Sequence, residues 1–109
     1  MRRWPAVLAV AYAAVAGACG GSPFPEPALT DTARAAPHFP GVTLAELKHG
    51  RSLYLSRCGG CHALKRPSEL PPEQWRVEVD EMRSKNGVKL SDAEAQAIVR
   101  YLAVAASPG

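Results

Sequence analysis

The sequence predicts an all-α protein with one small domain of about three helices. Its 109 residues are enough for a single domain of this size. Apolar residues recur at helical spacing in three stretches, and two of these stretches begin with the Ser/Thr-x-x-Glu pattern of a helix N-terminus. Proline and glycine lie between the stretches, as expected where helices end.

The first helix is expected to begin at Leu44 and to run close to Arg57. Thr43 and Glu46 form a capping box directly before it. Its apolar side chains at helical spacing are Leu44, Leu47, Tyr54 and Leu55.

The middle helix is expected to open at Pro72 or Glu73, and the pair Asn86-Gly87 should end it. The final helix follows Ser91 and Glu94, which form a second capping box. The expected apolar residues are Trp75, Val79 and Met82 in the middle helix and Ile98, Tyr101 and Leu102 in the final one.

Residues 1–18 have the pattern of an export signal peptide. Arg2 and Arg3 give it a positive start, and an apolar core too short to span a membrane follows. Without these two arginines, 11 basic residues face 10 acidic ones. Such a nearly neutral chain lacks the basic surface of a nucleic-acid binder, so no nucleic-acid partner is expected.

Cys19 follows the small residues Ala16-Gly17-Ala18, a sequence that resembles the bacterial lipobox. We expect Cys19 to become an acylated first residue that anchors the chain to a membrane, which also accounts for an otherwise unpaired exported thiol. The alternative is ordinary signal cleavage at the same bond, which would give a soluble exported chain.

Residues 19–40 are expected to form the anchor and a tether, and residues 41–109 the folded domain. The stretch from Gly20 to Pro27 is dominated by glycine and proline and cannot sustain a helix or a paired strand. The alternative is an ordered arm that packs on the domain through Phe24 or Phe39.

The organising motif is Cys58-Gly59-Gly60-Cys61-His62, which has the spacing of a c-type haem attachment site. Each thiol can add to one haem vinyl group, and the adjacent imidazole can bind the iron. The motif therefore predicts one covalently attached haem c. A bare C-x-x-C also occurs in redox-active thiol sites and in zinc sites.

The sequence around the motif resembles the class I cytochromes c over residues 43–105. Gly50, Tyr54 and Cys58 follow one another at intervals of four, and Ile98 precedes Tyr101 by three, as in the first and last helices of that family. The resemblance implies a compact cytochrome c fold of about three helices wrapped around one covalently bound haem. In that fold the two helices cross at these residues.

The resemblance also implies a hydrogen bond from His62 to a proline carbonyl in the following loop, for which Pro67 is the nearest candidate. Met82 is the expected sixth ligand, since no other methionine remains after removal of the leader. Alternatives are packing by Met82 alone, His38 over the iron, or an open sixth site. His49 is expected at the surface.

Together these features predict a monomeric single-electron carrier, not an enzyme, on the periplasmic side of a bacterial membrane. Its partners would be other redox proteins. The first alternative is a five-coordinate haem c that senses gases or acts as a weak peroxidase, with Met82 only packing. The second is a haemless thiol oxidoreductase that uses Cys58 and Cys61.

Overall fold

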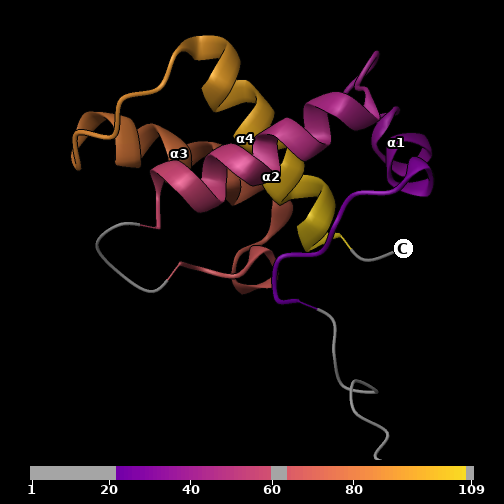
Figure 1. Cartoon of the computed structure of the whole chain (residues 1–109), viewed down its shortest axis with the longest axis horizontal. Coiled ribbons are helices and arrows are strands. Elements are labelled where there is room, and N and C mark those ends of the chain that lie inside the picture. Colours follow the sequence, from indigo (N-terminus) through magenta and orange to yellow (C-terminus); the bar gives the residue numbers. More distant parts are fainter. Residues whose placement is uncertain (1–21, 60–63, 108–109) are drawn as a thin grey trace, which may run out of the picture.

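The computed structural model describes residues 22–59 and 64–107 (Figure 1). Within these ranges the chain forms four α-helices, two short 3-10 turns and no strand, which confirms the all-α prediction. No helix in the described ranges is both long and apolar enough to cross a membrane. The elements are α1 (Leu29–Ala35), α2 (Leu44–Arg57), η1 (Pro67–Glu69), η2 (Pro72–Gln74), α3 (Trp75–Ser84) and α4 (Asp92–Ala106).

Helices α2 and α4 form the frame of the fold and share its most extensive contact. They cross at Gly50, where an added Cβ would overlap the carbonyl oxygen of Ala97 and lie 3.0 Å from Cβ of Tyr101. Only glycine permits this approach. Tyr54 and Ile98 lie in the same buried cluster, so the predicted crossing is confirmed.

The main apolar cluster lies where α3 packs against this frame. Figure 1 shows α3 and α1 on opposite sides of the crossing helices. The tryptophan that opens α3 is completely buried. The buried members of the cluster are Leu53, Tyr54, Trp75, Val79, Ala95, Ala97, Ile98, Tyr101 and Leu102.

The ends of the helices follow the predicted capping residues with one difference. At α4, Ser91 and Glu94 make both bonds of the capping box, at 3.1 and 3.0 Å. At α2, Thr43 accepts the amide hydrogen of Glu46 at 3.0 Å. The Glu46 carboxylate does not complete the box, because it pairs with Arg100 at 2.7 Å and thereby ties α2 to α4.

The middle helix begins in two stages. A 3-10 turn starts at Pro72, as predicted for the helix, and α3 proper starts at Trp75. After α3 the chain turns at Gly87, whose φ of 68° lies in the left-handed region that glycine tolerates. Met82 lies in the last turn of α3, partly buried against the main cluster.

The N-terminal arm, residues 22–40, is ordered against the domain and does not form the expected open tether. Tyr101 donates its hydroxyl hydrogen to the carbonyl of Pro25 at 2.9 Å, and Arg51 donates to the carbonyl of Phe24 at 3.0 Å. Proline prevents a helix here, but its carbonyls remain free to accept hydrogen bonds from side chains of the frame. The alternative of a packed arm is therefore the one that the described residues follow.

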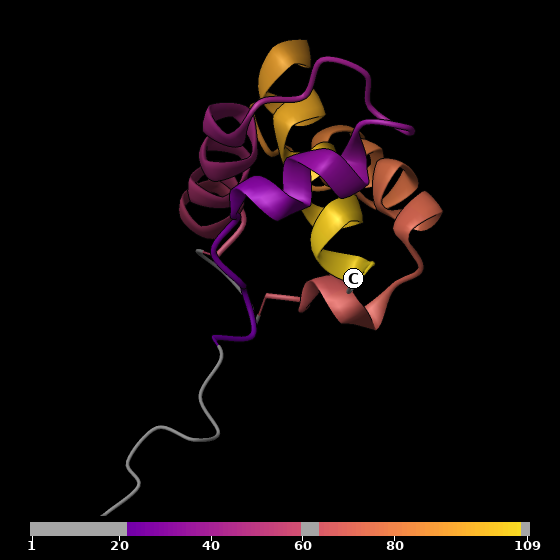
Figure 2. The ribbon, with the colours of Figure 1, turned by 90° about the vertical axis from the view of Figure 1, so that its right-hand side faces the viewer.

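The arm also contains α1, a helix that the sequence analysis missed. Figure 2 shows α1 in front of α4 with α2 at its side, and both helices contact it. Ala35 of α1 is buried with Leu47 and Val104 in a second, smaller cluster, against which Phe39 and Val42 pack. The division of the chain at Gly41 stays a prediction.

Candidate haem site

Cys58, the first cysteine of the motif, is the C-cap of α2. Its amide donates to the carbonyl of Tyr54 at 3.1 Å, and its side chain is partly buried. Burial raises the pKa of the Cys58 thiol above its ordinary value. At Gly59 a Cβ would lie 2.6 Å from the carbonyl oxygen of Leu55, so the helix end itself requires this glycine.

The other motif residues, Cys61 and His62, lie outside the described residues, as does Cys19. The structure describes the chain on both sides of the motif, up to Gly59 and again from Leu64. The chemical roles of Cys61 and His62 are therefore inferred from the sequence. The structure describes the residues on either side of them.

Cys58 and other partly buried apolar side chains, among them members of four segments around the motif and α3, pack against the main cluster. These segments are the end of α2, the loop after the motif, α3 and the connection between α3 and α4. A c-type haem needs thiols at the end of a helix, a soft or imidazole ligand for the iron, and apolar walls against its ring. The described side chains fit these needs, and they are Cys58, Leu64, Leu70, Met82 and Leu90.

Two buried aromatic side chains hold the loop that follows the motif. Tyr54 donates its hydroxyl hydrogen to the carbonyl of Lys65 at 2.8 Å. Trp75 donates its indole hydrogen to the carbonyl of Pro67 at 3.0 Å. The two rings contact each other edge to face, with centroids 6.0 Å apart. The carbonyl of Pro67 thus has a donor in Trp75, and its predicted bond to His62 stays untested.

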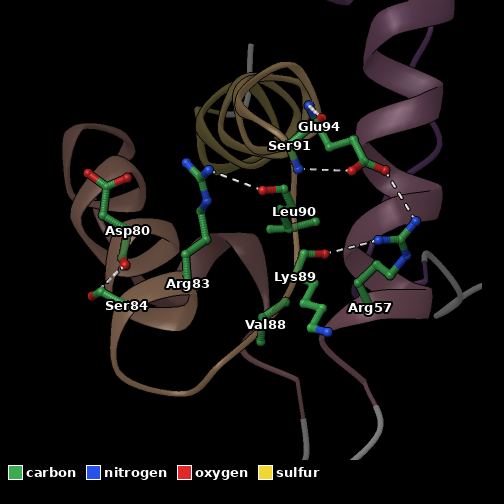
Figure 3. Close-up of a pocket in the computed structure, with 9 residues that line it drawn as sticks. All are labelled: Arg57, Asp80, Arg83, Ser84, Val88, Lys89, Leu90, Ser91 and Glu94. Carbon is green, nitrogen blue, oxygen red and sulfur yellow. Dashed lines mark hydrogen bonds and ion pairs between the residues drawn. The ribbon is translucent and has the colours of Figure 1, made fainter.

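Two arginines fasten the connection between α3 and α4 (Figure 3). Arg57, the residue before Cys58, donates to the carbonyl of Lys89 at 3.0 Å. Arg83, the residue after Met82, donates to the carbonyl of Leu90 at 3.1 Å. The end of α2 and the end of α3 are therefore both tied to the same connecting segment.

These arginines border an open hollow of about 780 Å³. Neither Cys58 nor Met82 lines this hollow. The hollow therefore adjoins Arg57, next to the motif, but it is not the pocket in which Cys58 and Met82 would hold a haem. The lining residues are Arg57, Asp80, Arg83, Ser84, Val88, Lys89, Leu90, Ser91 and Glu94.

The basic groups that flank the motif are paired with carboxylates. Arg57 lies 3.2 Å from Glu94, and Lys65 lies 2.8 Å from Glu78. The hydrogen bond to Glu78 raises the pKa of the Lys65 amine, so this amine stays charged. The backbone hydrogen bond from Ser91 lowers the pKa of Glu94, and the charge of Arg57 acts in the same direction. Both pairs are exposed enough to be weakened by salt.

The bonds that Tyr54, Trp75 and Arg57 make to the backbone were not predicted from the sequence. One signal was present for the tyrosine: a buried phenol seeks a hydrogen-bond partner, and Tyr54 lies one helical turn before Cys58. No comparable signal identifies the particular carbonyls, because they lie in loops.

The all-α fold and the C-x-x-C-H sequence that starts at the C-cap of α2 are the features of a c-type cytochrome. The model of the family "Dihaem cytochrome c" matches residues 54–108, half of the chain, including the motif, α3 and α4. The chain belongs to this family. The searches of curated proteins and of solved structures gave no match.

The family's description specifies two haems, whereas the sequence printed above contains one C-x-x-C-H motif. Its three cysteines are Cys19, Cys58 and Cys61, so no second pair exists at that spacing.

Proposed function

We propose that the chain is a single-electron carrier with one c-type haem. Thioethers from Cys58 and Cys61 would hold the haem, and His62 and Met82 would bind its iron. One observation carries the proposal: the C-x-x-C-H motif lies inside the matched span, and its first residue, Cys58, caps α2 and packs against the apolar cluster that Met82 also contacts.

When bound, a c-type haem supplies an iron that takes up and releases one electron. The side chains of this protein would have three tasks. The cysteines would hold the ring, His62 and Met82 would bind the iron, and the partly buried leucines would shield the haem from water. No side chain is required to break or make a substrate bond, so we propose no enzymatic activity.

The number of haems can be tested by comparing the haem content of the exported protein with its protein concentration. We expect one haem per chain, because only one pair of cysteines has the required spacing. A ratio of two would contradict the proposal and would follow the description of the family instead.

The ligation by Met82 is supported by its partial burial against the same cluster as Cys58. The test is the near-infrared spectrum of the oxidised protein, in which methionine-ligated ferric haem has a weak charge-transfer band. We expect this band in the wild type and its loss in Met82→Leu, which keeps the apolar bulk but removes the sulfur. Val99→Ala, a change at another partly buried side chain on the same cluster, should retain the band.

The competing proposal is an open sixth site with Met82 only packing. It would be favoured if the wild type lacked the band and bound carbon monoxide readily after reduction. A protein without any haem absorbance would instead favour a thiol oxidoreductase.

We further propose export and lipid anchoring at Cys19. The supporting pattern is the leader 1–18 and the small residues before the cysteine. The described part of the arm starts at Ser22, three residues after Cys19, and three residues of extended chain span at most about 11 Å. An acylated Cys19 would therefore keep the domain close to the membrane surface. Labelling with a radioactive fatty acid, lost in Cys19→Ala, tests the anchor.

The proposed partners are other redox proteins, and the proposed working form is a monomer on the periplasmic side. The nearly neutral charge without the leader gives no preference for a strongly acidic or basic partner.

A further inference from the structure

One residue, Tyr54, contacts the chain on both sides of the haem motif. Its backbone carbonyl accepts the amide hydrogen of Cys58 at 3.1 Å, and its hydroxyl donates to the carbonyl of Lys65 at 2.8 Å. The side chain is completely buried. Because the ring is rigid and packed, these two bonds fix the distance between the end of α2 and the loop that follows the motif.

Trp75 makes the same kind of bond two residues further along the loop. Its indole hydrogen binds the carbonyl of Pro67 at 3.0 Å, and both partners are buried. The edge-to-face contact of its ring with Tyr54 couples the two bonds. Two donors from different helices therefore hold the loop at Lys65 and at Pro67.

Tyr101 provides a matched comparison within the same cluster. It is 2% exposed, and its hydroxyl donates to the carbonyl of Pro25 at 2.9 Å. This bond joins the same kinds of donor and acceptor as that of Tyr54, but it fastens the N-terminal arm, whereas the bond of Tyr54 fastens the loop after the motif. A difference between the two tyrosines thus reports the location of the bond and not its strength.

We infer that Tyr54 and Trp75 are positioning residues for the axial ligand His62. Lys65 follows His62 by three residues in the sequence, so bonds that hold Lys65 and Pro67 would restrict the backbone that carries the imidazole. Groups that orient an axial ligand from outside the coordination sphere determine how it presents its nitrogen to the metal. This inference rests on the proposed function, since it assumes that His62 binds haem iron.

The test compares Tyr54→Phe and Tyr101→Phe in the exported protein with its haem attached. Each variant loses one hydroxyl, and both should unfold at a similarly lower temperature than the wild type. The deciding measurement is the electron paramagnetic resonance spectrum of the oxidised protein, because its g values depend on the orientation of the axial ligands. We expect a shifted or doubled low-spin signal in Tyr54→Phe and an unchanged signal in Tyr101→Phe.

Hydrogen exchange provides a second, independent measurement. In Tyr54→Phe the amides of Arg66 and Glu69, which are hydrogen-bonded within the loop, should exchange up to about tenfold faster, while that of Asp31 in the arm is unchanged. Tyr101→Phe should give the reverse pattern. Trp75→Phe, which removes the indole donor, should resemble Tyr54→Phe in both measurements.

Equal g values in the wild type and Tyr54→Phe would overturn the inference, as would an equal change in Tyr101→Phe. If Trp75→Phe does not yield folded protein, the two tyrosine variants still decide. Failure of the proposed function has a different signature, since the wild type itself would then lack a haem signal. The two failures are therefore distinguishable.

Discussion

The N-terminal arm and the haem side of the molecule are fastened to the same two helices in different ways. Each receives a hydrogen bond from a buried tyrosine, Tyr101 for the arm and Tyr54 for the haem side. The haem side, residues 64–84, also contributes Trp75 and Val79 to the main cluster, both completely buried.

The arm relies on polar contacts and a much smaller apolar contribution. Its ion pair between Arg51 and Glu26 leaves the carboxylate side chain 68% exposed, and the buried apolar residues of the described arm are Pro27 and Ala35. Burial of large apolar side chains stabilises far more than exposed ion pairs do. We therefore expect similar tyrosine bonds to secure two regions of very different stability.

The largest expected effect is that of Trp75→Ala on the haem side. Loss of a completely buried indole should lower the free energy of unfolding by about 4 kcal/mol. Guanidinium unfolding of the haem-loaded protein, followed by far-ultraviolet circular dichroism, measures this loss. Arg76→Ala, at the exposed position next in sequence, should change stability by less than about 0.5 kcal/mol.

Removal of the arm should have a smaller effect. A mature chain that begins at Gly41 loses Ala35 and the packing of Phe39 from the small cluster, along with the bond from Tyr101. We expect a loss of about 2 kcal/mol in the free energy of unfolding, with the haem spectrum unchanged. A loss as large as that of Trp75→Ala would refute the distinction between the two regions.

Within the arm, Arg51 should matter more than its acidic partner. Arg51→Ala removes the bond to the Phe24 carbonyl together with the ion pair, so we expect about 1 kcal/mol of destabilisation and faster proteolysis within the arm. Glu26→Gln removes only an exposed charge and should cost less than about 0.5 kcal/mol. Raising the salt concentration should reduce the effect of Glu26→Gln but largely preserve that of Arg51→Ala.

The sequence predicted the frame and the haem side better than the arm. Capping residues and the glycine at the crossing located α2 and α4, because these signals act locally or through one close contact. The apolar stripe of α2 was partly wrong, since Leu53 is buried where Leu55 was expected. The packing of the arm depends on bonds between Pro25 and Tyr101, which are 76 residues apart, and no local pattern contains that information.

The motif itself was predictable because thioether attachment demands a fixed spacing of cysteines and histidine. Its supports were not, since Tyr54 and Trp75 bind carbonyls, which every residue possesses. A side chain that binds the backbone leaves no complementary residue type to find in the sequence.

The last prediction concerns the ionisation of Tyr54 and Tyr101, which should have the smallest effect on stability at neutral pH. It also compares the two tyrosine bonds most directly. Burial raises the pKa of Tyr101 to about 12, although the nearby charge of Arg51 lowers it. Burial also raises the pKa of Tyr54, and the negative charges of a Cys58 thiolate, when no haem is attached, and of Glu78 and Glu69 act in the same direction. Tyr101 should therefore ionise first as the pH rises, releasing the arm before the haem-side loop.

The sign of the effect follows from proton binding. Below pH 10 both tyrosines are neutral whether the chain is folded or unfolded, so they contribute no pH dependence. Above pH 10 the unfolded chain releases protons that the folded chain retains, so the free energy of unfolding falls by at most about 1.4 kcal/mol per pH unit for each tyrosine. Nuclear magnetic resonance of the reduced protein with ¹³C-labelled tyrosine can follow each ring separately. Ionisation of either ring near pH 10 in the folded protein would contradict its burial, and ionisation of Tyr54 first would reverse the order of the two anchors.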